Sequence, residues 1–193
     1  MLLEILNETF KLKDFDSGRI DSIQIVADRE EWNLEEQLKK LNIQYLNICG
    51  SDLPIESSSL GLICSNNTLE HINSTILEKI FIEFKRIKSP LGIMSHFIDM
   101  SDHFAHLDNQ ISAFNFLKFS PGAWKMIDNS LQPQNRLRIA DYRALHRNAN
   151  FEILDEIDTN GKNEDVDQQE IADCFKKIKK EDLFVTHSHI VSI

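Results

Sequence analysis

Apolar residues recur at helical spacing in three parts of the first half of the chain. They predict a helix over residues 1–15 and another over 33–41, where Asn33 takes the N-cap position. A third helix is predicted after Thr75 and Glu78, whose spacing is that of a capping box. The sequence therefore predicts three helices in the first hundred residues.

Short apolar runs between these helices predict strands. SIQIVAD (22–28) alternates only weakly, whereas IQYLNI (43–48), LGLICS (60–65) and IMSHFI (93–98) are compact and apolar. LGLICS is apolar on both faces, as is typical of a strand in a parallel sheet covered by helices. The order strand, helix, strand over residues 43–98 indicates an α/β crossover.

The region 99–140 differs from the rest because it is polar and rich in His, Asp and Asn. Ser120 and Pro121 are the N-cap and first residue of one predicted helix, and a second helix is predicted from about 141 to 148. Its aromatic residues stand at near-helical spacing, which favours a packed core over a base-stacking platform: Phe114, Phe116, Phe119 and Trp124.

Two apolar segments at higher residue numbers, FEILDEI (151–157) and LFVTHSHIVSI (183–193), predict strands that pair antiparallel at the end of the sheet. The residues between them, 158–182, are charged and predict a partly helical surface segment. Within it, the lysine-rich run 176–180 is typical of a solvated helix face.

Composition and charge exclude several classes of protein. The chain has 193 residues and a formal net charge of −10, which argues against a nucleic-acid partner, since binding to phosphate backbones needs a basic surface. No apolar run approaches the roughly 20 residues of a membrane span, and no signal peptide is evident. Cys49, Cys64 and Cys174 are far apart, which argues against disulfides and zinc sites. We expect a cytoplasmic protein.

Two strings in the middle of the chain resemble a known family. DLPIESSSLGLICSNNTLEHI (52–72) and RIKSPLGIMSHFID (86–99) are similar to the corresponding segments of class I S-adenosylmethionine-dependent methyltransferases of the type 11-like kind. The resemblance runs over 43–193, and 99–140 resembles a substrate-side insertion of one bacterial branch. It implies a Rossmann-like, doubly wound α/β sheet, mainly parallel with an antiparallel C-terminal strand pair. It also implies S-adenosylmethionine as cofactor and a small-molecule or sugar-like acceptor.

The chain departs from this family where the cofactor's main cradle belongs. The family opens with a strand and a glycine-rich loop, but the six glycines here stand far apart, at positions 18, 50, 61, 92, 122 and 161. We therefore expect an incomplete sheet, in which 1–42 is a helical, edge-covering segment and 43–193 is the C-terminal part of a truncated methyltransferase domain. Unpaired sheet edges would then favour a protein partner or self-association. A non-catalytic interaction module derived from a methyltransferase is the alternative.

The resemblance also implies cofactor contacts at five positions. These are Cys49, Gly50 and Asp52 around the Asp-Leu-Pro loop, and Ser65 and Asn66 at the end of the strand LGLICS. Ser65 and Asn66 would line the methionine side of the cofactor. A turn that caps the next helix explains the same two residues equally well.

Asp99, Asp102, His103 and His106 form the motif D-x-x-D-H-x-x-H just beyond a predicted strand. We predict Asp102, His103 and His106 as catalytic residues, because an imidazole near neutrality can act as general base on a substrate hydroxyl. Capping and holding of the loop is the alternative. His103 and His106 have the spacing to share a metal, but the ligand set is incomplete and we expect no metal. A metal-dependent hydrolase is a third function class, with only this motif in its favour.

Six polar residues around this motif are candidates for substrate binding. Arginines can hold an anionic or sugar substrate through forked hydrogen bonds, but they can equally tie the insertion to Asp99 and Asp102. The histidine that follows Glu70 can instead pack beneath the sheet. The candidates are His71, His96, Asp99, Asn135, Arg136 and Arg138.

Overall fold

The computed structural model describes residues 33–129, 133–162 and 168–193. The chain divides into two compact units, Met1–Ile48 and Cys49–Ile193. The helix predicted over 1–15 and the strand predicted over 22–28 lie outside the described residues. Within the described ranges, no helix has the length and apolar character that would let it cross a membrane.

The first unit contributes one described helix, α3 (Leu34–Lys40), which confirms the helix predicted there. Asn33 caps it, because its side-chain oxygen accepts a hydrogen bond from the Glu36 amide at 3.3 Å. The strand predicted over 43–48 is wrong. These residues form no ladder with any described strand, and Tyr45 is 73% exposed, so the apolar run lacks the neighbour that would hold its backbone in a sheet.

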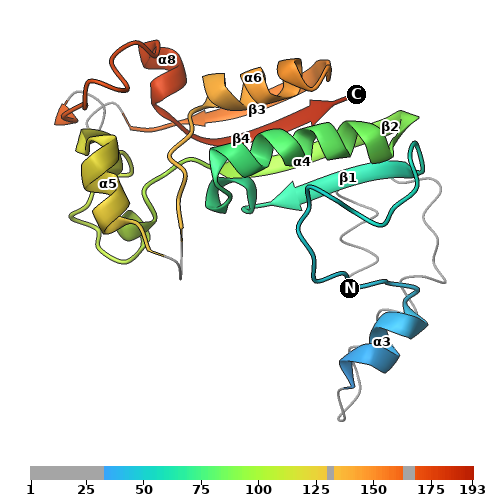
Figure 1. Cartoon of the computed structure of the whole chain (residues 1–193). Coiled ribbons are helices and arrows are strands. Elements are labelled where there is room, and N and C mark those ends of the chain that lie inside the picture. Colours follow the sequence, from blue (N-terminus) through green and yellow to red (C-terminus); the bar gives the residue numbers. More distant parts are fainter. Residues whose placement is uncertain (1–32, 130–132, 163–167) are drawn as a thin grey trace, which may run out of the picture. The chain divides into compact units, whose positions relative to one another are not determined.

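The second unit is built on a four-stranded sheet (Figure 1). Its strands are β1 (Leu60–Asn66), β2 (Lys88–Asp99), β3 (Ile153–Asn160) and β4 (Val185–Ser192), in the spatial order β1-β2-β4-β3. β1 and β2 are parallel, and β4 is antiparallel to both β2 and β3. Three strands therefore run one way and β4 runs the other way, which confirms the predicted sheet with its antiparallel C-terminal pair.

Two helices cover one face of the sheet. α4 (Ser74–Ile87) connects β1 to β2, and α6 (Ile139–Asn148) lies beside it (Figure 1). The predicted Thr75–Glu78 capping box is replaced by Asn73, whose side-chain oxygen accepts from the Thr75 amide at 3.0 Å. The apolar faces of the two helices and of the sheet form the main core, which includes Leu77, Phe81, Met94, Ile98, Ile139, Tyr142 and Ile190.

The opposite face of β1 is not buried as the sequence predicted. Leu62 is 59% exposed, and its register partner Ile93 and the more distant Phe97 are exposed as well. β1 pairs only with β2 among the described strands, so it lies at an edge of the sheet. The apolar character of LGLICS on both faces therefore reflects a strand covered on one face only.

The insertion has a small core of its own. It contains the short helices η2 (His103–His106), η3 (Asn115–Lys118) and α5 (Pro121–Ile127), and it packs against residues near α8 (Lys180–Leu183). Ser120 caps α5 as predicted, accepting a hydrogen bond from the Ala123 amide at 3.2 Å. The aromatic residues are core, as predicted, in a cluster that includes Phe114, Phe116, Leu117, Trp124, Phe175, Leu183 and Phe184. The lysine-rich run 176–180 is solvated but mostly in turns rather than in a helix.

Gly92 allows β2 to pass close to β1 where the register between them shifts. Leu60 is opposite Lys88, whereas Leu62 is opposite Ile93. A Cβ atom at Gly92 would lie 2.6 Å from the carbonyl oxygen of Leu60, a distance that real side chains do not reach. Any larger residue there must push the two strands apart.

Replacing Gly92 with alanine should therefore lower the free energy of unfolding by about 1–3 kcal/mol, the usual cost of overpacking. Gly61→Ala is the matched control, because a Cβ there has no atom within 4 Å and should change stability by less than about 0.5 kcal/mol. Urea unfolding of the two variants measures the difference. Equal stabilities would show that the strands adjust without strain.

Candidate functional site

Polar side chains gather where the parallel strands β1 and β2 end. Parallel strands end at the same edge of a sheet, and in α/β folds this edge carries the ligand site. β1 leads into the short helix η1 (Leu69–His71), and β2 leads into η2. A backbone hydrogen bond from Asn67 to the carbonyl of Phe97, 2.9 Å long, holds the two ends together.

Asp99, at the end of β2, is the centre of a cluster of polar side chains, which we call the Asp99 cluster. Its carboxylate accepts hydrogen bonds from the Ser101 amide at 2.8 Å and the Ser101 hydroxyl at 2.6 Å. The Nε2 atoms of His103, His106 and His187 lie 3.5, 3.6 and 3.4 Å from its oxygens. Burial alone would raise the pKa of Asp99, but the hydrogen bonds from His103 and Ser101 lower it well below its ordinary range. Asp99 is therefore a buried anion that orients three imidazoles.

His187 is the member of this cluster that the sequence analysis missed. It lies on β4, directly opposite Asp99 in the antiparallel register between β2 and β4. The signal was present in the alternation of VTHSHI, which places His187 and His189 on one face of the strand. Only the register of β4 against β2 shows that this face meets Asp99.

The two predicted catalytic histidines differ in accessibility. The side chain of His103 is 11% exposed, whereas that of His106 is 54% exposed. Their rings stack with centroids 5.2 Å apart, and the hydrogen bond to Asp99 raises the pKa of His103. His106 Nε2 also lies 3.2 Å from the Ser101 hydroxyl. His106 is thus the imidazole that a solute can reach.

Asp102, the third predicted catalytic residue, holds the loop. Its side chain is fully buried, and one oxygen accepts from the Phe104 amide at 2.9 Å to cap η2. The other oxygen accepts from the Asn115 side chain at 3.1 Å. The Asp102 carboxylate therefore links η2, at the beginning of the insertion, to Asn115 in its middle.

Glu70 and His71 bring a second group of side chains to the same edge. Glu70 is 1% exposed, and burial raises the pKa of its carboxyl group. His71 Nδ1 lies 2.7 Å from the carbonyl oxygen of Pro133, so Nδ1 carries the proton that it donates. The rings of His71 and His103 meet edge to face, with centroids 4.9 Å apart. His71 thus faces the Asp99 cluster rather than packing beneath the sheet.

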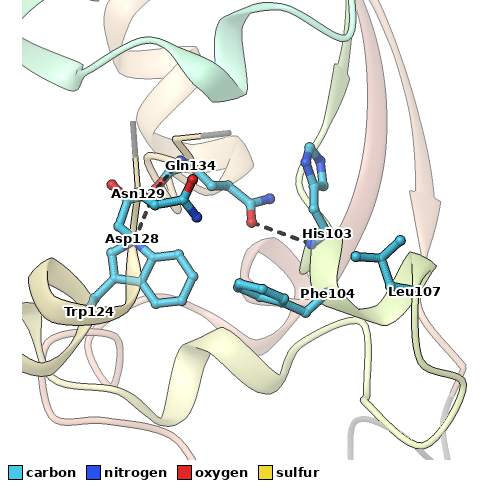
Figure 2. A pocket seen from close by; sticks show the side chains of 7 residues that line it. All are labelled: His103, Phe104, Leu107, Trp124, Asp128, Asn129 and Gln134. Atoms are coloured by element: carbon cyan, nitrogen blue, oxygen red, sulfur yellow. Dashed lines mark hydrogen bonds between the residues drawn. The ribbon is translucent and has the colours of Figure 1, made fainter. Parts of the chain in front are cut away.

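A small hollow opens beside the cluster (Figure 2). Gln134 spans it, because its side-chain oxygen accepts from the backbone amide of His103 at 3.4 Å and its backbone amide donates to the Asp128 carboxylate at 3.0 Å. Figure 2 shows the His103 imidazole pointing away from Trp124 and the centre of the hollow. The lining residues are His103, Phe104, Leu107, Trp124, Asp128, Asn129 and Gln134.

The five residues predicted to bind the cofactor fall into two groups along the chain. Cys49, Gly50 and Asp52 lie in the loop before β1, where the Cys49 thiol is 3.1 Å from the Ser51 hydroxyl. Ser65 and Asn66 lie at the other end of β1, beside the polar edge. The pairing of β1 with β2 brings the second group to the end of β2, whereas the first group lies beside Ile80 of α4.

His96, predicted to bind substrate, lies in the core. It is fully buried on the face covered by α4, where its ring stacks on Phe84 at 5.8 Å between centroids. Its Nδ1 atom lies 2.8 Å from the Ser65 hydroxyl. Burial lowers the pKa of His96 to about 4, so the ring is neutral in the folded protein at neutral pH.

Asn135 locks η1 to the insertion. Its side-chain nitrogen donates to the carbonyls of Leu69 and Ile72, both at 2.8 Å. Its backbone amide donates to the carbonyl of Glu70 at 2.8 Å. Asn135 therefore fixes the backbone on which Glu70 and His71 are carried.

The two arginines predicted to bind substrate are also bonded to backbone carbonyls. Arg136 donates to the carbonyls of Phe116 and Phe119 at 2.9 and 2.8 Å and lies over the Trp124 ring. Arg136 thus binds backbone carbonyls of the insertion. It does not form the ion pair with Asp99 or Asp102 that the sequence suggested.

Arg138 has no exposed surface. It donates to the carbonyls of Met100 at 2.5 Å, Leu183 at 2.9 Å and Val185. Burial lowers the pKa of Arg138 to about 10, which leaves it charged at neutral pH. Its guanidinium therefore joins the end of β2 to the beginning of β4.

Comparison with known proteins gives structural matches only. No protein-family model matches the chain, and no curated protein matches it. The PH0226 protein of Pyrococcus horikoshii OT3 is similar in structure, with a TM-score of 0.50 and 12% identity over 82% of this chain and 66% of that protein. A geranyl diphosphate C-methyltransferase of Streptomyces coelicolor A3(2) gives a TM-score of 0.48 and 12% identity over 81% and 56%. A SAM-dependent methyltransferase of Leishmania major gives 0.47 and 14% over 83% and 50%.

The chain therefore spans between 50% and 66% of the length of these three proteins. At such identities the likeness concerns the fold alone. At that level, the predicted Rossmann-like α/β class is confirmed, and the structures that resemble the chain in fold include S-adenosylmethionine-dependent methyltransferases.

His96 should make the stability of the protein depend on pH. In the unfolded chain its pKa is near 6.5, and in the folded protein it is about 4. Between these values the unfolded chain binds a proton that the folded protein does not, so the free energy of unfolding falls as the pH falls. This one group accounts for a loss of about 3 kcal/mol.

Urea unfolding of the wild type and of His96→Phe between about pH 6.5 and pH 4 measures this contribution, and the variant should lose less stability on acidification. Ser65→Ala serves as control, because it removes the hydroxyl but keeps the buried imidazole, and it should retain the wild-type slope. An unchanged slope in His96→Phe would contradict the assignment.

Arg138→Met should destabilise the protein by about 3 kcal/mol or more, because three buried carbonyls lose their donor. Arg147→Met on the same helix is the control, since Arg147 is exposed and its loss should change stability by less than about 0.5 kcal/mol. Thermal and urea unfolding compare the two. Similar stabilities for both variants would show that the buried guanidinium is dispensable.

Proposed function

We propose that this chain is a methyl-transfer domain that uses S-adenosylmethionine and a small-molecule acceptor with a hydroxyl group. One observation carries the proposal: a buried carboxylate with an accessible imidazole, Asp99 with His106, stands beyond the carboxyl ends of two parallel strands and beside a hollow. This is the edge at which α/β folds of this class bind ligands. The resemblance of residues 52–72 and 86–99 to class I S-adenosylmethionine-dependent methyltransferases supports the choice of reaction.

The described residues fit only one part of this cofactor. Asn66 is exposed at the carboxyl end of β1, where the family resemblance places the methionine portion. The hydroxyl of Ser65 is bonded to His96 instead. The loop 49–52 lies beside the middle of α4, where a Cβ atom at Gly50 would be 3.6 Å from the Ile80 side chain. The proposal for the chain's own side chains therefore concerns the acceptor rather than the cofactor.

His106 is the proposed general base. Its Nε2 atom faces Asp99 at 3.6 Å and Ser101 at 3.2 Å, which favours the tautomer with a proton on Nε2. Nδ1 then has a lone pair that can accept the hydroxyl proton of the acceptor. The Asp99 carboxylate stabilises the imidazolium that forms. When bound, the cofactor supplies a methyl group on a sulfonium, and the bonding electrons of the broken bond stay on sulfur.

Asp99 is assigned a positioning role, because it acts on the acceptor only through the imidazoles that it holds. The hollow beside it has an aromatic and amide lining, in Phe104, Trp124 and Gln134, that suits a small polar molecule with an apolar face. Phosphate groups fit poorly, since Asp128 also lines the hollow.

An interaction module without catalysis is the second candidate function. The observation that favours it is the exposure of apolar side chains on one face of the sheet, with Leu62, Ile93 and Phe97 all more than a third exposed. Such a face fits a protein partner better than it fits solvent.

Titration calorimetry with S-adenosylmethionine and S-adenosylhomocysteine separates the two functions. A methyl-transfer domain that is sufficient alone should bind one molecule of either ligand per chain. The absence of heat at millimolar ligand would overturn this function and favour the interaction module. The protein is used as the full chain.

His106→Gln should leave cofactor binding within about twofold of wild type but lower methyl transfer to a hydroxyl acceptor by about 10²–10⁴-fold. Transfer of labelled methyl groups to a panel of sugars and small alcohols provides the measurement. His189→Gln is the matched control, because His189 is a histidine of β4 bonded to Ser95 and not to Asp99. Full activity in His106→Gln would exclude His106 as the base.

A further inference from the structure

The carboxylate of Glu70 is buried and has no hydrogen-bond partner among the described residues. The residue is 1% exposed, and neither of its side-chain oxygens accepts a hydrogen bond from any residue that the structure describes. A buried carboxylate normally accepts several hydrogen bonds or faces a cation, because its charge is otherwise unfavourable in the interior. No described lysine or arginine forms an ion pair with Glu70, and the imidazole of His71 lies 3.9 Å from its carboxylate.

His71 presents a nitrogen to this carboxylate in the form that binds metals. Its Nδ1–H donates to the carbonyl oxygen of Pro133 at 2.7 Å, so Nε2 is the nitrogen with the lone pair. That Nε2 atom lies 3.9 Å from Oε1 of Glu70. Histidine ligands of metal sites typically donate their other N–H to a backbone carbonyl or carboxylate in this way.

His103 completes the group from the other strand. One ligand atom from each of Glu70, His71 and His103 lies within 4.8 Å of the other two. Asp99 stands next to the Nε2 atom of His103 at 3.5 Å, as an outer carboxylate does in many histidine metal sites. Both imidazoles thus have a second residue that fixes the ring.

We propose that Glu70, His71 and His103 bind a divalent transition-metal ion, with Zn²⁺ as the reference case. Two imidazoles and one carboxylate suit Zn²⁺, Mn²⁺ or Co²⁺, whereas Mg²⁺ and Ca²⁺ prefer oxygen ligands alone. Ligands about 2.1 Å from one ion are at most about 4.2 Å apart, so binding draws the three side chains somewhat closer. Three protein ligands leave open positions for a water molecule or an acceptor oxygen.

This site differs from the metal pair that the sequence suggested and for which no metal was expected. His103 and His106 have suitable spacing in sequence, but their rings stack with centroids 5.2 Å apart in η2. The tertiary structure instead brings His103 to η1, which follows the neighbouring strand. The accessible imidazole of His106 is left for another role.

A second hollow is lined by His71, one of the three proposed ligands. Its lining includes His71, Asn73, Gln134 and Asn135. A metal-bound acceptor hydroxyl would lose its proton more readily, because a divalent cation stabilises the resulting oxyanion. This role rests on the proposed function, whereas the metal site itself does not.

Binding of Zn²⁺ to the full chain, first stripped with a chelator, tests the site. Because three exposed thiols could also bind Zn²⁺, the titration is made with the cysteines alkylated, using a chromophoric chelator as competitor. We expect one Zn²⁺ per chain, an increase in Tm on binding, and visible absorption bands when Co²⁺ replaces Zn²⁺.

Glu70→Gln and His71→Gln should each weaken Zn²⁺ binding by about a hundredfold or more, and the metal should no longer raise their Tm. His106→Gln is the matched control, because His106 also faces Asp99 but is not one of the three ligands, and it should bind within about twofold of wild type. Circular dichroism confirms that each variant is folded.

Two results would overturn the proposal. One is the absence of stoichiometric Zn²⁺, Mn²⁺ and Co²⁺ binding by the folded wild type. The other is loss of binding in His106→Gln with binding retained in Glu70→Gln, which would assign the metal to the His103–His106 pair. Neither result depends on cofactor calorimetry, so failure of the metal site and failure of methyl transfer are distinguished.

Discussion

The buried guanidinium of Arg138 is the interaction on which the polar edge of this fold depends. Arg138 stands at the beginning of α6 and donates to carbonyls just after β2 and around the beginning of β4. A planar cation with donors in fixed directions can satisfy three carbonyls that no strand or helix would pair. It thereby fixes the end of β2 next to the beginning of β4. Asp99 and His187 face each other across this junction. Arg138, which the sequence predicted as a substrate contact, is therefore a structural residue of the fold.

Local patterns predicted the helix caps and those apolar runs that find a neighbouring strand in the sheet. The strands at 60–65 and 93–98, the C-terminal strand pair and the cap at Ser120 are all present. The apolar run at 43–48 has the same composition as a strand, but a strand exists only where another strand accepts its hydrogen bonds. No single-sequence pattern carries that information, so this prediction is wrong.

The sequence predicted the residues at the centre of the candidate site but not the residues that surround them. Asp99, His103 and His106 are close in sequence, and their position after a strand placed them at the ligand edge. His187 and Glu70 join them only through the pairing of strands that are distant in the chain. Conversely, His96 and Arg138 look like exposed polar groups in the sequence, and both are fully buried with partners that composition does not reveal.

The position of β4 has a consequence for how the molecule assembles. It follows β3 in the chain, yet it lies between β2 and β3 in the sheet. Contacts such as Ser95 with Val191 join residues about a hundred positions apart, and closing so long a loop slows folding. β3 has no described neighbour other than β4, so it cannot join the sheet until β4 has inserted. The Asp99 cluster is therefore completed only when β4 pairs with β2, the slowest pairing event. A folding intermediate that contains β1, α4 and β2 would expose Asp99 without His187.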